Sequence, residues 1–357
     1  METPADVTVH MPRMIEVAVT EELQRGRAPS IRDVARLAGV SHQTVSRVLN
    51  HHPSIRPETK QRVLDVMEQL QYKPNRAARA LVTSRSRTIG ILSASSTWYG
   101  PASSIAAIEE AARASGYWVS TANIESSDAR TIADGLEHLA AQGIEGLVVI
   151  APQVRVFDTL AQLSIDVPYV TLQSTGRDPD HALSVDQIAG ARLATRHLIA
   201  QGHRSIYHLA GPQDWIEAEA RMRGFLEEMS AQDVPTTAPI LGDWTADFGY
   251  HAGRELLTVR DFTAIFSSND QMALGLMHAI RDAGLEIPRD VSIVGFDDIP
   301  EAAHFWPPLT TVRQDFAELG RRCVALLLGD LDPAAPDYRG TITPELVVRG
   351  TTGPPLF

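Results

Sequence analysis

The stretch IRDVARLAGVSHQTVSRVLN, residues 31–50, has the pattern of two short helices joined by a tight turn. Ser30 stands where a helix N-cap is expected, just before the first periodic apolar residues. Gly39 supplies the turn, and a second helix is expected from Ser41 to Leu49. Pro57 opens a third helix at its first turn, where proline is tolerated. The stretch therefore predicts a helix-turn-helix module.

In such a module the second helix lies in the major groove, with its N-terminal residues at base edges. His42, Gln43 and Arg47 are expected to read bases, because Gln bonds bidentately to adenine and Arg to guanine. Hydroxyl, amide and phenol groups nearby are expected to contact phosphates, which fix the register without reading the sequence. These are Ser30, Ser41, Thr44, Ser46, Asn50, Thr59 and Tyr72. For any one of them, an ordinary role as a helix cap is an equally good interpretation.

The charge of the chain is distributed unevenly, and this supports a nucleic-acid partner. The total is −12, which taken alone argues against one. Residues 29–88, however, carry eleven Lys or Arg against four Asp or Glu, a net charge of +7. With −2 on residues 1–28, the rest must carry −17 to reach the total. A basic block on an acidic body favours a DNA-binding head, although a solvated basic face without a partner remains the alternative.

From Thr88 onward, short apolar strands alternate with amphipathic helices. This order predicts α/β architecture with parallel sheets and helices on both faces, so that ligands bind at the carboxyl ends of strands. The strands are expected at 89–93, 118–122, 147–150, 169–172, 206–209, 264–266, 291–295 and 346–348.

Several classes of protein are disfavoured by composition and by missing motifs. With 44% hydrophobic and 21% charged residues the chain has the composition of a globular protein, and its single cysteine allows no internal disulfide. Neither a membrane span nor a signal peptide is apparent, so we expect a cytoplasmic protein. Common nucleotide-binding, hydrolase and metalloprotease motifs are absent. We therefore expect no enzyme activity, no cofactor and no metal.

Residues 31–50 resemble the headpiece of the LacI/GalR family, and YKPNRAARAL, from Tyr72 to Leu81, resembles its hinge. The resemblance continues to about residue 350. It implies a homodimer on a palindromic operator, with a hinge helix that folds on binding. By resemblance, Asn75, Ala78 and Leu81 contact the minor groove, and Leu81 wedges between base pairs, as apolar side chains do when they kink DNA. The alternative for Leu81 is a linker residue leading into the first strand.

The family fold implied is a helix-turn-helix headpiece with a hinge helix, followed by a periplasmic-binding-protein-like core of two doubly wound subdomains. The expected domains are an extension of unassigned role at 1–28, the DNA-binding domain at 29–74, and the hinge helix and linker at 75–86. The effector-binding N-subdomain is expected at 87–185 plus 315–342, and the C-subdomain at 186–314 plus 343–357. Met11 or Met14 is an alternative start to Met1.

The resemblance also implies an effector site. It assigns Arg221, Asn269 and Asp297 to effector hydroxyls and Trp244 to the apolar face of a sugar. The segments that carry it are residues 242–244, 268–275, 294–298 and 307–316. An N-cap role for Asn269 and a turn role for Asp297 remain alternatives. Gln173 and Trp98 are expected in the same site, where they depart from the family's galactoside-binding pattern.

These observations predict a repressor of sugar-catabolism genes that a β-galactoside or related glycoside releases from its operator. The extra aromatic surface at Trp98 and Tyr99 suits a larger glycoside such as a disaccharide. One alternative is a purine-type repressor whose ligand promotes DNA binding. Another, weaker one is a solute-binding protein, which shares the body fold but lacks the basic head.

Overall fold

The computed structural model describes residues 29–49, 52–73, 85–94, 97–124, 128–151, 153–160, 165–172, 182–329 and 340–356. The chain divides into two compact units, residues 1–85 (the head unit) and 86–357 (the core unit), and each is described by itself. Asn50, Gln173 and the expected hinge helix with Asn75, Ala78 and Leu81 lie outside the described residues. In the part described, no helix has the length and apolar character to cross a membrane.

The head unit contains the three predicted helices, α2 (Ile31–Leu37), α3 (His42–Leu49) and α4 (Pro57–Gln69). Ser30 begins α2 through a capping box with Asp33, in which each side chain bonds the other's backbone N–H. Gly39 has φ +64°, the left-handed conformation that the turn requires. A small apolar core holds the three helices together. It consists of Val34, Ala35, Ala38, Val45, Val48 and Val63.

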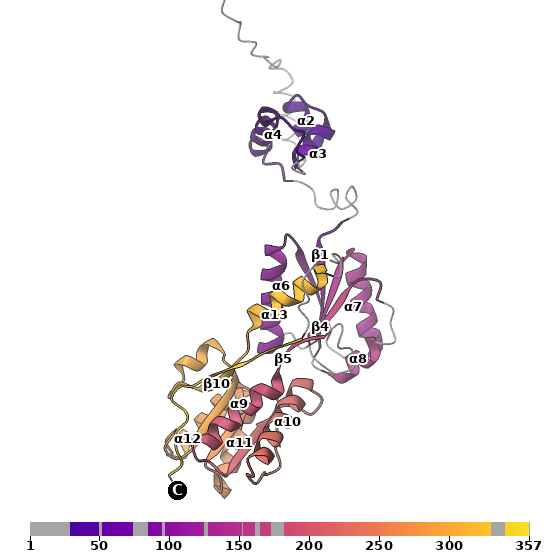
Figure 1. Cartoon of the computed structure of the whole chain (residues 1–357). Coiled ribbons are helices and arrows are strands. Elements are labelled where there is room, and N and C mark those ends of the chain that lie inside the picture. Colours follow the sequence, from indigo (N-terminus) through magenta and orange to yellow (C-terminus); the bar gives the residue numbers. More distant parts are fainter. Residues whose placement is uncertain are drawn as a thin grey trace, which may run out of the picture. The chain divides into compact units, whose positions relative to one another are not determined.

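The core unit builds two six-stranded sheets from its described residues (Figure 1). The first has the order β11-β5-β4-β3-β1-β2, and all its neighbouring strands run parallel. Its strands are β1 (Thr88–Ala94), β2 (Trp118–Ile124), β3 (Gly146–Ile150), β4 (Tyr169–Leu172), β5 (Ala182–Val185) and β11 (Gly340–Ile342). Helices α6 (Tyr99–Ala114) and α13 (Phe316–Gly329) cover one face, and α7 (Ala129–Ala141) and α8 (Val154–Leu160) the other.

The second sheet has the order β12-β10-β9-β8-β6-β7. Its strands are β6 (Ile206–Ala210), β7 (Ile240–Leu241), β8 (Ala264–Ser267), β9 (Ser292–Asp297), β10 (Thr310–Arg313) and β12 (Glu345–Val347). Helices α9 (Gln187–Ala200) and α10 (Ile216–Ala231) pack on one face, and α11 (Ala246–Val259) and α12 (Asp270–Asp282) on the other. The 3-10 helix η1 (Pro300–His304) follows β9.

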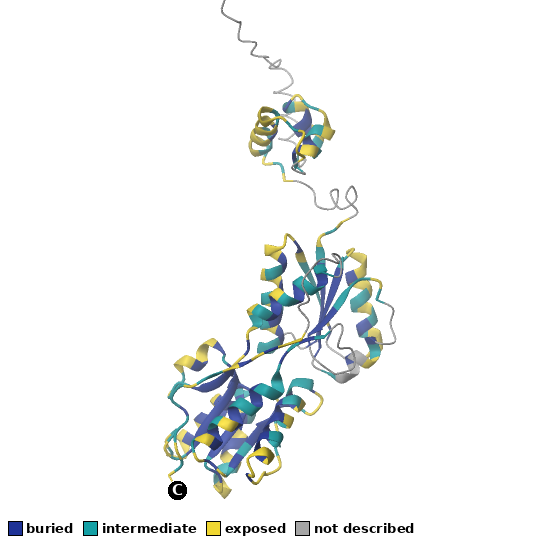
Figure 2. Cartoon of the chain, in the orientation of Figure 1, coloured by how far each residue is buried: buried dark blue, intermediate teal, exposed yellow. Residues whose placement is uncertain are grey.

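Within the described residues the chain passes between the two sheets after β5, after β10 and after β11. Strand β12 pairs antiparallel with β10, because it enters its sheet directly from β11 and not through a covering helix. The predicted fold class is confirmed: parallel strands are buried between helical layers, as the dark interior in Figure 2 shows. Four short strands, β5, β7, β10 and β11, were not among those predicted from the sequence.

The close approach of α11 and α12 supplies a stability prediction. A Cβ at Gly275 would clash with the Ala246 carbonyl oxygen, a backbone atom that cannot move aside. We expect Gly275→Ala to lower the free energy of unfolding of the core unit by about 1–3 kcal/mol, the usual cost of overpacking. Denaturant unfolding measures this. Gly100→Ala is the matched control, since nothing lies within 4 Å of its Cβ position. An equal effect of both substitutions would contradict this packing.

Candidate functional site

A cavity of about 480 Å³ lies between the two sheets of the core unit. Residues at the carboxyl ends of parallel strands from both sheets line it, which is where α/β folds bind ligands. The first sheet and its helices contribute Trp98, Tyr99, Ile150, Leu172, Val185 and Phe316, and the second contributes Gln187, Trp215, Arg221, Trp244, Asn269 and Asp297. The cavity is therefore built by both halves of the core unit.

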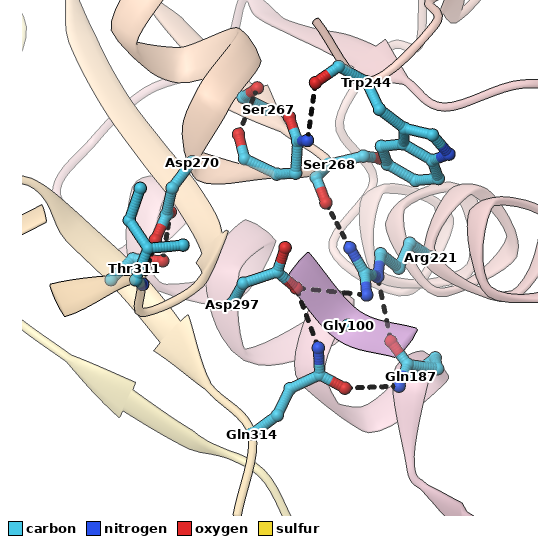
Figure 3. Close-up of polar contacts among 12 residues, drawn as sticks. Gly100, Gln187, Arg221, Trp244, Ser267, Ser268, Asp270, Asp297, Thr311 and Gln314 are labelled. Carbon is cyan, nitrogen blue, oxygen red and sulfur yellow. Dashed lines mark hydrogen bonds and ion pairs between the residues drawn. The ribbon is translucent and has the colours of Figure 1, made fainter. Parts of the chain in front are cut away.

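Arg221, on α10, is the buried cation of the site, with 5% of the residue exposed. Its Nε donates to Gln187 Oε1 at 2.8 Å, its Nη1 donates to the Ser268 carbonyl, and its Nη2 lies 3.3 Å from Asp297 Oδ1 (Figure 3). Its guanidinium carbon lies 3.8 Å from the ring centre of Phe296, a cation–π contact. Guanidinium has five N–H donors, so these contacts leave two for a ligand.

Asp297 ends β9 in a strained backbone conformation, with φ +106°. Its Oδ1 accepts from Gln314 Nε2 at 2.7 Å and faces Arg221. None of the hydrogen bonds found between described residues uses its Oδ2, which remains as an acceptor for a ligand hydroxyl. Burial raises the pKa of Asp297 to about 6, although the charge of Arg221 and the Gln314 hydrogen bond act in the opposite direction.

Trp244 lies in the cavity wall beside Arg221, 5.6 Å from its guanidinium carbon to the ring centre. Its φ of +74° turns the ring back over Gly211, and any Cβ at Gly211 would strike that ring. Trp215 meets Trp244 edge-to-face, with ring centres 5.5 Å apart. The structure thus holds Trp244 as a flat apolar wall, the geometry that a sugar ring face requires.

Asn269 performs the helix-cap role that was its alternative interpretation. Its Oδ1 accepts from Met272 N at 2.9 Å at the start of α12, and its Nδ2 donates to the Trp244 carbonyl at 2.9 Å. It also lines the cavity, where its second amide hydrogen is the group left for a ligand. Asn269 therefore anchors Trp244 whether or not it touches an effector.

Neighbouring Asp270 and Asp298 fulfil structural roles. Asp270 is fully buried and accepts from Ile299 N at 2.9 Å and from the Thr311 hydroxyl at 2.6 Å, which ties α12 to the loop after β9. Burial raises the pKa of Asp270 well above its usual range. Asp298 accepts from Arg313 and Arg349 at 2.7 and 2.6 Å. These contacts hold the segment that presents Asp297.

Among the cavity residues, Gln187, Trp215 and Gln314 were not predicted from the sequence, whereas Tyr99, expected beside Trp98, also lines the cavity. Gln187 and Gln314 carry ordinary amides, and only their positions beside the passages between sheets distinguish them. Two buried atoms on lining residues, Trp244 Nε1 and Gln271 Oε1, have no hydrogen-bond partner in the structure as described. Buried polar atoms usually have one, so both atoms are available to a polar ligand in the cavity.

In the head unit, α3 presents His42, Gln43 and Arg47 to solvent while Val45 and Val48 face the core. Ser41 Oγ accepts from Thr44 N at 3.1 Å and caps the helix. Ser30 is likewise engaged as a cap, as the alternative interpretation held. Ser46, Thr59 and Tyr72 are partly exposed. Tyr72 also packs against the head core, and burial raises its pKa.

No three His, Cys, Asp or Glu side chains of the described ranges cluster closely enough to hold a metal ion. Asp297, which lines the cavity, is instead paired with Arg221, and the neighbouring Asp270 is hydrogen-bonded to a backbone N–H and a hydroxyl group. The arrangement suits reversible binding of a polar, ring-shaped molecule.

Comparison with known proteins agrees with both units. The family described as "Bacterial regulatory proteins, lacI family" matches residues 30–75, and "Periplasmic binding protein-like domain" matches residues 195–352. The chain is 33% identical to the lactose operon repressor of Escherichia coli (strain K12), over 90% of each chain. It is 34% identical to the transcriptional repressor PurR of Mannheimia succiniciproducens, over 90% of this chain and 97% of that one.

Solved structures give the same result. A lac repressor dimer bound to operator and the anti-inducer ONPF superposes with a TM-score of 0.83 at 33% identity, covering 92% of this chain and all of that one. A complex of the transcriptional regulator CelR with cellobiose gives a TM-score of 0.66 at 29% identity, covering 90% and 99%. These similar proteins are transcriptional regulators.

The buried Asp297 carboxyl predicts a pH-dependent stability. Its pKa is about 6 in the folded chain and 3.8 ordinarily, so its contribution to stability is complete below pH 3.8 and is lost as the pH rises through 6. Relative to Asp297→Asn, which cannot titrate, the wild type should lose about 1 kcal/mol between pH 5 and pH 7. Urea unfolding at several pH values measures the difference. A difference that is flat across this range would contradict the assignment.

Proposed function

This chain belongs to the lacI family of bacterial regulatory proteins and is a DNA-binding transcriptional repressor of that family, and on this premise we propose its ligand and mode of action. It represses genes of sugar catabolism by binding a palindromic operator as a homodimer in the cytoplasm. A glycoside in the cavity of the core unit releases it. The dimer is proposed because a similar lac repressor was solved as a dimer on its operator.

The proposed domains follow the order of the chain. Residues 29–74 form the DNA-binding domain and residues 75–86 the hinge helix and linker. Residues 87–185 plus 315–342 form the N-subdomain, and residues 186–314 plus 343–357 the C-subdomain. Base reading belongs to His42, Gln43 and Arg47, whose side chains are exposed on α3.

The observation that carries the choice of a sugar is the buried Arg221–Asp297 pair beside Trp244. Two free guanidinium donors and the Asp297 Oδ2 acceptor suit adjacent hydroxyls, each of which both donates and accepts. The indole face suits the apolar face of a pyranose ring. Trp98, Tyr99, Trp215 and Phe316 extend the aromatic surface, which favours a disaccharide or another β-galactoside-like glycoside over a monosaccharide. The similar CelR was solved with cellobiose.

A purine-type corepressor is the second candidate, because PurR is as similar in sequence as the lac repressor. Calorimetry of the full chain against lactose, cellobiose, galactose, glucose, hypoxanthine and guanine separates the two. We expect a disaccharide to bind and the nucleobases not to bind, because Asp297 and Arg221 together suit hydroxyl pairs. Tight binding of a nucleobase with no response to any sugar would reverse the proposal.

The cavity residues predict a selective loss of response. Arg221→Ala leaves Asp297 as an uncompensated buried charge and removes two donors, so sugar affinity should fall by about two to three powers of ten. Operator affinity without sugar should be unchanged, because Arg221 lies in the core unit. Arg223→Ala is the matched control, because Arg223 lies on the same helix and lines the same cavity. Its side chain, however, is 69% exposed and is paired locally with Glu227. A normal sugar response in Arg221→Ala would remove the site from this cavity.

Operator binding supplies a paired prediction for the head unit. With an operator selected from randomised duplex DNA, Arg47→Ala should cost about 1–3 kcal/mol and relax the preference at one base pair. Lys73→Ala should weaken binding to all duplexes alike and reduce the salt slope by about 1. Fluorescence anisotropy over a salt series measures both quantities. An Arg47→Ala variant with unchanged sequence preference would show that α3 is not the reading helix.

A further inference from the structure

Four polar side chains beside the cavity form a closed ring (Figure 3). Arg221 Nε donates to Gln187 Oε1 at 2.8 Å, and Gln187 Nε2 donates to Gln314 Oε1 at 2.8 Å. Gln314 Nε2 then donates to Asp297 Oδ1 at 2.7 Å, and Arg221 Nη2 lies 3.3 Å from that same oxygen. Arg221 and Asp297 are thus joined twice, once directly and once through the two glutamines.

The direction of the hydrogen bonds in this ring is determined by its two ends. A guanidinium group only donates and a carboxylate only accepts, so both amides must point the same way between them. If Gln314 turned over, its Oε1 would face the Asp297 carboxylate. Gln187 has both amide atoms engaged, and it therefore cannot change one contact without changing the other.

The two glutamines stand where the chain passes from one sheet to the other. Gln187 is the first residue of α9, two positions after β5 ends at Val185. Gln314 directly follows β10, before α13 returns to the first sheet. The N-cap bond from Ala189 N to Asp186 Oδ1, 2.9 Å, fixes the start of α9 to the backbone of the first passage. A displacement of Gln187 is therefore a displacement of that passage.

We infer that Gln187 is the positioning residue through which an occupied cavity acts on two of the three described passages between the subdomains, the one after β5 and the one after β10. This inference rests on the proposed function, because it assigns the regulation of the same site. An effector hydroxyl that takes the remaining donors of Arg221 and Oδ2 of Asp297 displaces these two side chains from their positions in the ring, and Gln187, which is bonded to Arg221, transfers the change to Gln314. A ligand shifts a conformational equilibrium only through contacts that differ between the states, and the ring provides such contacts.

Two substitutions distinguish the two functions that Gln187 has in the ring. One function is to hold Arg221, and the other is to link the two passages through Gln314. Gln187→Ala removes both functions. Gln187→Glu keeps an acceptor for Arg221 but cannot donate to Gln314, so it retains the first function and loses the second. Gln201→Ala, at the C-cap of the same helix, is the control.

The first measurement needs no ligand: hydrogen exchange of the full-length protein. In both Gln187 variants the amides of residues 310–316 should exchange about fivefold faster, the equilibrium factor for the loss of one hydrogen bond. The backbone amides around Arg221 should exchange faster only in Gln187→Ala, because Gln187→Glu keeps an acceptor for Arg221. The control should match the wild type. Unchanged exchange at residues 310–316 in Gln187→Ala overturns the inference, whether or not a sugar binds.

The second measurement uses lactose and cellobiose as probes. In the wild type, sugar should alter exchange at residues 182–187 and 310–316. In Gln187→Glu, sugar should bind within about fivefold of the wild-type affinity while the change at 310–316 disappears. A full response at 310–316 in Gln187→Glu overturns the inference. If the wild type binds neither sugar, the proposed effector class fails, and the ligand-free comparison still decides the role of Gln187.

Discussion

The rest of the site depends on one constraint: a guanidinium and a carboxylate, 5% and 7% exposed, must be stabilised away from water. Desolvation of two ions costs several kcal/mol each unless hydrogen bonds satisfy their remaining donors and acceptors. The Ser268 carbonyl, Gln187, Gln314 and the Phe296 ring supply these contacts. Because the compensation is incomplete, two donors and one carboxylate oxygen remain, and a ligand that fills them completes an arrangement the protein leaves open.

The backbone conformation at the end of β9 follows from the same need to hold the Asp297 carboxylate in a buried position. Asp297 and Asp298 have φ of +106° and +52°, strained conformations that persist only where surrounding contacts impose them. Arg313 and Arg349 hold Asp298, and Asp270 holds the next backbone N–H, at Ile299. Strain at the end of β9 is therefore concentrated where the carboxylate must point into the cavity, and the flanking ion pairs keep it there.

The head was predictable from sequence because its signals are local: a capping box at Ser30, a turn glycine and proline at the start of a helix. The long buried strands were predictable from apolar runs. Strands such as β7, two residues long, have no periodicity to detect. Resemblance placed Arg221, Trp244 and Asp297 in one cavity, and the structure brings them together. Gln187 and Gln314 were missed because their hydrogen bond joins residues 127 positions apart, which no local pattern encodes.

The charge distribution determines how large a structural change in the core the proposed regulation requires. Residues 89–357 carry −17, and such a body is repelled by the DNA phosphates that the +7 block at residues 29–88 attracts. Under the proposed function these two electrostatic contributions to operator affinity have opposite signs. Allosteric coupling is typically about 1–3 kcal/mol, which changes affinity five- to 150-fold. A ligand-dependent change in the three hydrogen bonds and the ion pair of the ring is of that order, so the proposed effector need only make the contacts of the head less favourable.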